Sequence, residues 1–164
     1  MASNPQIILI DGPAGAGKST LSLKLQAELN CEIIHLDSIY NGWDDALGPS
    51  LTKLLSDLVE DFINGEKFEL PIFNWKENRY DSVKIIKPAD FLIIEGVGAG
   101  QSAIRGFASK LYWVEVDDEV GIKRVLERDG YEIAEHMKRF KESEAKHFEA
   151  ERTRDFADFI ITTS

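Results

Sequence analysis

A glycine-rich stretch near the N-terminus carries residues that could hold phosphate groups. Residues 12–19 read GPAGAGKS, which fits the pattern G-x-x-x-x-G-K-[ST]. In such a loop, backbone N–H groups cradle phosphate oxygens, the lysine reaches the outer phosphates and the hydroxyl binds Mg²⁺. We therefore expect Lys18 to act on the phosphates and Ser19 to bind the metal ion. The expected nucleotide-binding residues are Gly12, Ala14, Gly15, Ala16, Gly17, Lys18, Ser19 and Thr20.

Two carboxylates follow apolar segments elsewhere in the chain. Glu95 ends the run FLIIE, and Asp37 follows the run IIHL. If both runs are strands that flank the first, the two carboxylates converge beside the phosphate loop. One would hold Mg²⁺, directly or through water, and the other would accept the proton of an attacking hydroxyl. We assign the metal to Glu95 and the base to Asp37, with exchanged roles, or turn and capping roles, as the alternatives.

Two arginines lie in the segment GIKRVLERDG. Arg124 and Arg128 are four residues apart, so they share one face of an expected helix. Arginine neutralises charge on a transferring phosphoryl group. A turn sequence, Asp-Gly, follows them, and we expect a mobile lid over residues 124–135 that carries both. Salt bridges to neighbouring acids are the alternative role.

Aromatic residues gather in YNGWDD and PIFNWKENRYD, two segments of loop character. Their rings could form the wall of a pocket for a phosphate acceptor, because aromatic faces stack on rings. Packing beneath a loop is the alternative. The expected acceptor contacts are Asp37, Tyr40, Trp43, Phe73, Trp75 and Arg79. The three histidines have no other metal-ligating residues at a suitable spacing, and we expect them to be structural.

The elements that must position these residues are visible as short apolar runs. The runs are continuous rather than alternating, which is typical of strands covered on both faces. Helical spacing of leucines predicts a helix over residues 46–64. The alternation of strands and helices predicts one domain over residues 1–164, an α/β fold built as a three-layer α/β/α sandwich on a mostly parallel five-stranded sheet. The expected strands span residues 6–10, 32–36, 91–96, 111–116 and 158–162.

Composition limits the class of protein. The chain has 164 residues, of which 43% are hydrophobic and 29% charged, with a formal net charge of −10. This charge argues against nucleic acid or an anionic membrane as the main partner. Cys31 is the only cysteine, so no internal disulfide can form. With no secretory signal and no apolar run of membrane-spanning length, we expect a cytoplasmic protein.

These residues resemble the uridine-kinase-like branch of P-loop kinases, over nearly the whole chain. GPAGAGKST resembles the family's phosphate loop, LDSIY its strand-end D-S-F-Y motif and LIIEG its strand ending in Glu-Gly. The resemblance implies that ATP and Mg²⁺ are cofactors, that Asp37 is the catalytic base and that Arg124 and Arg128 are lid arginines. The chain departs from the family where a Tyr-Asp-Phe segment followed by His and Arg binds the base. That stretch here is Phe73–Asn74–Trp75, then Asn78–Arg79.

Three functions remain in competition at this point. The first is transfer of the γ-phosphate of ATP to a hydroxyl of a small molecule, with a nucleoside as one candidate. The second is a nucleotide-dependent switch or regulatory NTPase, because D-E-V-G at residues 118–121 fits the D-x-x-G string of GTPases. No N-K-x-D stretch for guanine is present. The third is a binding module without catalysis, which the intact Lys18, Ser19, Asp37 and Glu95 disfavour.

Overall fold

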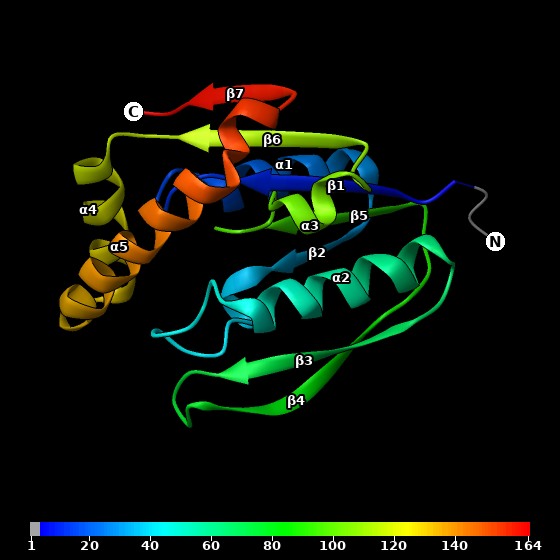
Figure 1. Cartoon of the computed structure of the whole chain (residues 1–164), viewed down its shortest axis with the longest axis horizontal. Coiled ribbons are helices and arrows are strands. Elements are labelled where there is room, and N and C mark those ends of the chain that lie inside the picture. Colours follow the sequence, from blue (N-terminus) through cyan, green and yellow to red (C-terminus); the bar gives the residue numbers. More distant parts are fainter. Residues whose placement is uncertain (1–3) are drawn as a thin grey trace.

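The computed structural model describes residues 4–164, in which strands and helices alternate through most of the chain (Figure 1). The strands are β1 (Gln6–Asp11), β2 (Glu32–His35), β3 (Phe68–Asn74), β4 (Arg79–Ile86), β5 (Phe91–Glu95), β6 (Lys110–Glu115) and β7 (Phe159–Thr162). The α-helices are α1 (Lys18–Leu29), α2 (Pro49–Ile63), α3 (Ser102–Arg105), α4 (Asp118–Asp129) and α5 (Ala134–Glu151). Short 3-10 helices are η1 (Leu36–Ser38), η2 (Tyr131–Ile133) and η3 (Thr153–Phe156).

Five strands form one sheet in the order β2-β5-β1-β6-β7. Every neighbouring pair is parallel. All five predicted strands are present, and the predicted parallel sheet is confirmed. Because parallel strands end at the same edge, the residues that follow β1, β2 and β5 are brought together there. The register places Ile10 opposite Glu95, and Glu95 opposite His35.

Different helices cover the two faces of this sheet. Along β1, Ile7 and Leu9 pack into a cluster with residues of α2, α3 and α5. The alternate residues Ile8 and Ile10 pack with the leucines of α1 on the other face. Since both faces are covered, every β1 residue from Ile7 onward is buried, which explains the unbroken apolar run.

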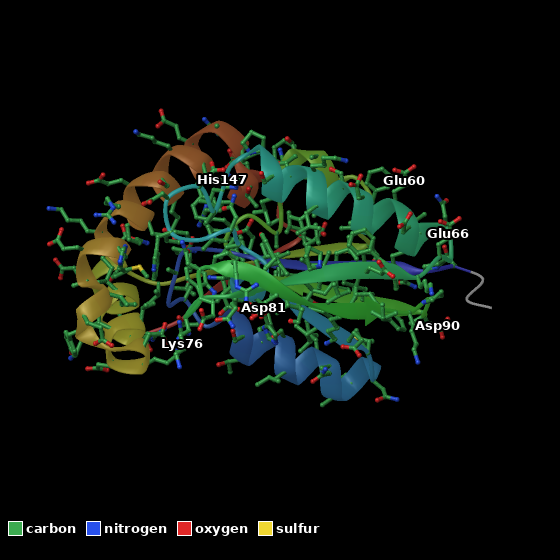
Figure 2. All side chains as sticks on the ribbon, turned by 90° about the horizontal axis from the view of Figure 1, so that it is seen from below. Glu60, Glu66, Lys76, Asp81, Asp90 and His147 are labelled. Carbon is green, nitrogen blue, oxygen red and sulfur yellow. The ribbon has the colours of Figure 1, made fainter. Side chains whose placement is uncertain are left out.

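The stretch that we expected to be a loop around residues 71–81 is a β-hairpin, so this prediction was wrong. β3 and β4 pair antiparallel, with a register shift at Ile72/Phe73. Asn78 has a φ of 53°, the left-handed conformation that suits a tight turn. In Figure 2 the hairpin lies across the view between α2 and α1. All of β4 except Ile86 is exposed, so it lacks the apolar pattern that marks a buried strand.

The charged C-terminal segment divides into α4 and α5 at Gly130, whose φ is 105°. Helix α2 begins at Pro49, three residues later than expected, because proline suits the first position of a helix. Within the part of the chain that the structure describes, no helix is both long and apolar enough to cross a bilayer.

Candidate functional site

A cavity of about 1010 Å³ opens at the C-terminal ends of β1, β2 and β5. Its wall comes from the phosphate loop, the segment after β2, the hairpin and helices α4 and α5. Its size is at the upper end of the range of ligand pockets, so it has room for a nucleotide and a second small molecule. The expected site residues that line it are Ala14, Gly15, Gly17, Lys18, Ser19, Thr20, Asp37, Tyr40, Trp43, Phe73, Trp75, Glu95, Arg124 and Arg128.

Two glycines of the phosphate loop are required by close backbone contacts. A Cβ atom at Gly12 would lie 1.9 Å from the Val114 carbonyl oxygen, and one at Gly15 would lie 2.1 Å from the Gly121 carbonyl oxygen. Both have positive φ, 144° and 77°. Gly12 and Ala16, which we expected to bind the nucleotide, are buried and do not line the cavity. Helix α1 begins directly after the loop, so its N-terminal N–H groups face the space that phosphates would occupy.

Lys18 is folded over this loop. Its ammonium donates a hydrogen bond of 2.8 Å to the Pro13 carbonyl oxygen, and the side chain is buried. Burial lowers the pKa of Lys18, while the carboxylates of Asp11 and Glu95 oppose that shift. Because a buried ammonium lacks solvent partners, phosphate oxygens in the loop would be stronger acceptors for it than a neutral carbonyl.

The expected metal-binding pair meets in the structure. The Ser19 hydroxyl donates to Glu95 Oε2 over 3.2 Å. A hydroxyl and a carboxylate are oxygen donors of the kind that Mg²⁺ takes, with the remaining ligands supplied by phosphates and water. In residues 4–164, no cluster of three or more His, Cys, Asp and Glu residues is arranged to hold a metal. The pair fits an ion that takes further ligands from the phosphates of a nucleotide.

His35 contacts the same Glu95 oxygen through Nδ1, although we expected this histidine to be structural. The hydrogen bond with Glu95 is the largest cause of the raised pKa of His35. The only sequence signal for it is its place at the end of an apolar run, next to the strand that carries Glu95. Its position shows that a side chain from β2 orients the carboxylate at the end of β5.

Asp37 lies in η1, with its side chain exposed to the cavity. The protein around the cavity mouth partly desolvates the Asp37 carboxyl group, and this desolvation is the largest cause of its raised pKa. The negative charge of Glu95 is the second cause. The hairpin holds this segment in place, because Trp75 Nε1 donates to the Asp37 carbonyl oxygen at 2.7 Å. The Tyr80 hydroxyl likewise donates to the Ile39 carbonyl oxygen at 2.6 Å. The segment that presents Asp37 is thus held through its backbone, while the carboxylate faces the cavity.

The aromatic residues form a continuous wall on this side of the cavity. Trp43 stacks on His136 of α5, with ring centroids 5.2 Å apart and planes at 7°. It also packs against Trp75, with centroids 5.2 Å apart. Phe73 packs edge-on against Trp75 at 5.2 Å. The wall therefore draws on three separate segments, the loop after β2, the hairpin and α5.

Two expected acceptor residues behave differently from the rest. Tyr40 is buried and its hydroxyl donates to the Val97 carbonyl oxygen at 2.6 Å, so the ring but not the hydroxyl is available to a ligand. Burial raises the pKa of Tyr40 well above its usual value. Arg79 lies exposed at the start of β4 and does not line the cavity, so the structure does not support it as an acceptor contact.

The two arginines of α4 differ in their partners. Arg124 donates to the Gly15 carbonyl oxygen at 3.0 Å and to Thr163 Oγ1 at 3.1 Å, which ties α4 to the phosphate loop. Arg128 makes a bidentate pair with Asp129, at 2.9 and 2.8 Å. The salt-bridge alternative thus holds for Arg128 in this state, although both arginines line the cavity.

The D-E-V-G string lies in the first turns of α4, where it serves packing. The Gly121 N–H donates to the Asp117 carbonyl oxygen at 2.9 Å, so it is not free to bind a phosphate. A Cβ atom at Gly121 would lie 2.5 Å from the Ala14 carbonyl oxygen. Glycine is needed here because the helix backbone packs directly on the phosphate loop. The string therefore no longer supports a GTPase-like switch.

Asp11 is a buried residue of the site that we did not predict. Its carboxylate accepts N–H groups of Gly12 at 2.7 Å, Gly98 at 3.1 Å and Gly100 at 2.8 Å. Burial nevertheless raises its pKa to about 6. It joins the start of the phosphate loop to the loop after β5. A sequence signal exists, because a carboxylate that ends an apolar run directly before the first loop glycine is placed for such a contact.

Comparison with known proteins identifies the family. The family model described as "AAA domain" matches residues 8–149. The chain belongs to this family. Among curated relatives, a tRNA dimethylallyltransferase of Helicobacter pylori is 32% identical over an alignment of 127 residues that covers 74% of this chain and 40% of that protein. A cytidylate kinase of Sulfurisphaera tokodaii is 26% identical over 141 residues, 86% of this chain and 72% of that protein.

The fold is that of P-loop kinases. The structure of a possible uridine kinase from Bacillus stearothermophilus superposes with a TM-score of 0.66, covering 98% of this chain and 90% of that chain. Identity is 19%, a level at which the likeness shows the fold alone. The predicted resemblance to uridine-kinase-like proteins is thus confirmed for architecture. This chain spans only 40% of the length of the dimethylallyltransferase relative.

Proposed function

We propose that this protein is an ATP-dependent phosphotransferase that moves the γ-phosphate of Mg-ATP to a hydroxyl of a small molecule. The observation that carries the proposal is that a phosphate loop, two carboxylates and an aromatic wall line one and the same cavity. A nucleotide switch needs no second ligand wall of this kind. A binding module would have no use for a carboxylate such as that of Asp37 facing the same space.

The residues of the cavity divide the chemistry between them. Mg²⁺, when bound at Ser19 and Glu95, neutralises phosphate charge. Lys18 and Arg124 lie on the loop side, where charge on the transferring group needs stabilisation. The acceptor oxygen attacks the γ-phosphorus, the bridging P–O bond to the β-phosphate breaks and ADP leaves. Asp37 takes the hydroxyl proton, and its raised pKa makes it a stronger base than an ordinary aspartate.

The acceptor side of the cavity favours an uncharged molecule with a ring. Its wall is largely aromatic or aliphatic, and Arg128 is already neutralised by Asp129. Lys76, labelled in Figure 2 on the turn of the hairpin, adds one exposed cation to the wall. A nucleotide acceptor would require more positive charge than this. The net charge of −10 disfavours a nucleic acid acceptor as well.

The test is a panel of acceptors incubated with Mg-ATP while ADP release is measured. The panel pairs each nucleoside with its monophosphate and adds small alcohols, and we expect turnover with an uncharged member. Asp37→Asn should reduce that turnover by about 10²- to 10⁴-fold while ATP still binds. Asp90→Asn is the matched control, because Asp90 is exposed, does not line the cavity and lies at the opposite end of the view from Lys76 (Figure 2).

One result would overturn the proposed function and another would overturn only the role of Asp37. The first is acceptor-independent hydrolysis with a strong preference for GTP over ATP, which would restore the switch hypothesis. The second is an Asp37→Asn variant with unchanged turnover, which would remove Asp37 as the base.

A further inference from the structure

Glu144 is a buried carboxylate that reaches the phosphate loop from the C-terminal helix α5. It is 3% exposed, and its Oε2 accepts the Ala14 N–H over 2.9 Å. Its other oxygen accepts from the Lys141 ammonium. Lys141 also donates to Asp118 of α4 at 3.0 Å. A charge that is buried in this way is stable only while both partners remain in place.

Helix α5 carries the acceptor wall on the same face as Glu144. His136 stacks on Trp43, and Met137 and Phe140 line the cavity. Phe140 and Glu144 are four residues apart, as are His136 and Phe140, so they follow one another along one side of the helix. Figure 1 shows α5 running from its start beside α4 back toward β6 and β7. One rigid helix therefore touches both halves of the cavity.

We propose that Glu144 is a positioning residue that couples the phosphate loop to the acceptor wall through α5. The inference rests on the proposed kinase function, since it concerns how an occupied nucleotide site prepares the acceptor site. Phosphates in the loop add negative charge close to Glu144. The Ala14 N–H and Lys141 hold that carboxylate in place, so the position of α5 depends on what the loop contains.

The contacts on either side of Glu144 make the coupling direct. Gly121 of α4 packs backbone to backbone on the loop, since a Cβ at Gly15 would lie 2.1 Å from the Gly121 carbonyl oxygen. Lys141 links α5 to α4 at Asp118. A displacement of the loop at Ala14 would therefore shift both α4 and α5, and a change of one side-chain conformation could not accommodate it. By reciprocity, a residue that couples two sites affects binding at both.

Hydrogen exchange measured by mass spectrometry tests the proposal on the full chain. Exchange is compared with and without a non-hydrolysable ATP analogue and Mg²⁺. We expect the analogue to slow exchange in the phosphate loop and also, by about tenfold, in the first half of α5, a size typical of coupled sites. In Glu144→Gln, slowing in the loop should persist while slowing in α5 falls to less than about twofold.

The variant is chosen because an amide has one acceptor oxygen. Glu144→Gln keeps the shape of the side chain but can satisfy only one of Ala14 and Lys141. Glu144→Ala removes both contacts and should give the same loss, provided that its melting temperature shows that it folds. Glu142→Gln is the matched control, since Glu142 is exposed on the same helix and should leave the slowing in α5 unchanged.

The outcomes separate the two proposals. No slowing in the phosphate loop of the parent protein would contradict nucleotide binding and hence the proposed function. Slowing in the loop without slowing in α5 would contradict the coupling alone. If hydrogen exchange in α5 slowed equally in the parent and in both Glu144 variants, Glu144 would have no part in the coupling.

Discussion

The two halves of the cavity are built in different ways. On the nucleotide side, Asp11, Lys18 and Glu95 are buried and bonded to backbone or to other polar side chains. On the proposed acceptor side, the wall consists of rings that pack stacked, tilted or edge-on, and Trp75 is 38% exposed. The first half is held by directional hydrogen bonds between buried groups. The second is held mainly by ring packing, although Trp75 and Tyr40 each donate a hydrogen bond to a backbone carbonyl oxygen. We therefore call the phosphate-loop side the rigid half of the cavity and the more exposed side, the proposed acceptor side, the adaptable half.

Lys18→Met should have the largest effect, because it removes the cation of the rigid half. Turnover of ATP should fall by about 10²- to 10³-fold, the usual cost of losing one preorganised charge partner of the transition state. Steady-state kinetics would measure the loss, and circular dichroism would confirm the fold. Lys123→Met, an exposed change on α4, is the control. Retained turnover in Lys18→Met would mean that the phosphates lie elsewhere.

Asp11→Asn should change how stability depends on pH. The folded pKa is raised from 3.8 to about 6, so the neutral form is favoured in the folded state. Its contribution is therefore fully present below pH 3.8 and is lost as the pH rises through about 6. A rise of this size corresponds to about 3 kcal/mol.

Urea denaturation of both proteins between about pH 3 and 7 would measure this contribution, because that range includes both 3.8 and about 6. We expect the free energy of unfolding of the parent, relative to that of Asp11→Asn, to decrease across the range. Parallel curves for the two proteins would show that Asp11 does not titrate there.

Gly121→Ala should disturb the contact between α4 and the phosphate loop. The added methyl would lie 2.5 Å from the Ala14 carbonyl oxygen, and backbone cannot yield as a side chain can. We expect a loss of about 1–3 kcal/mol in the free energy of unfolding, together with weaker ATP binding. Gly106→Ala is the control, since its φ is negative and its added methyl would meet open space, with none of the described residues beyond its chain neighbours within 4 Å. Equal stability of the two variants would contradict the packing role of Gly121.

Trp43→Leu should have the smallest effect and act on the adaptable half alone. Loss of the stacking on His136 and of the tilted packing against Trp75 should raise the KM for the acceptor by about tenfold, the order expected for one aromatic contact. The KM for ATP should change less than about twofold. Arg79→Ala, on the same side but outside the cavity wall, should change neither constant. Equal increases in both constants would show that the halves are not distinct.

The sequence by itself determined the frame of the site. The phosphate loop is a local pattern, and the apolar runs that lead to Asp37 and Glu95 are local as well. The parallel sheet follows from those runs, and it brings their ends to one edge. The hairpin could not be predicted, because β4 is exposed and its sequence lacks the apolar pattern of a buried strand.

Only the tertiary structure decided which groups meet at that edge. Glu144 and Ala14 are 130 residues apart, and Asp11 and Gly100 are 89 apart, so no local pattern announces either contact. The same holds for His35 beside Glu95 and for Gly121 against the loop. Hydrogen bonds and close backbone packing are sensitive to differences in distance of a few tenths of an ångström. Such distances are set when the helices dock on the sheet, and sequence spacing does not contain them.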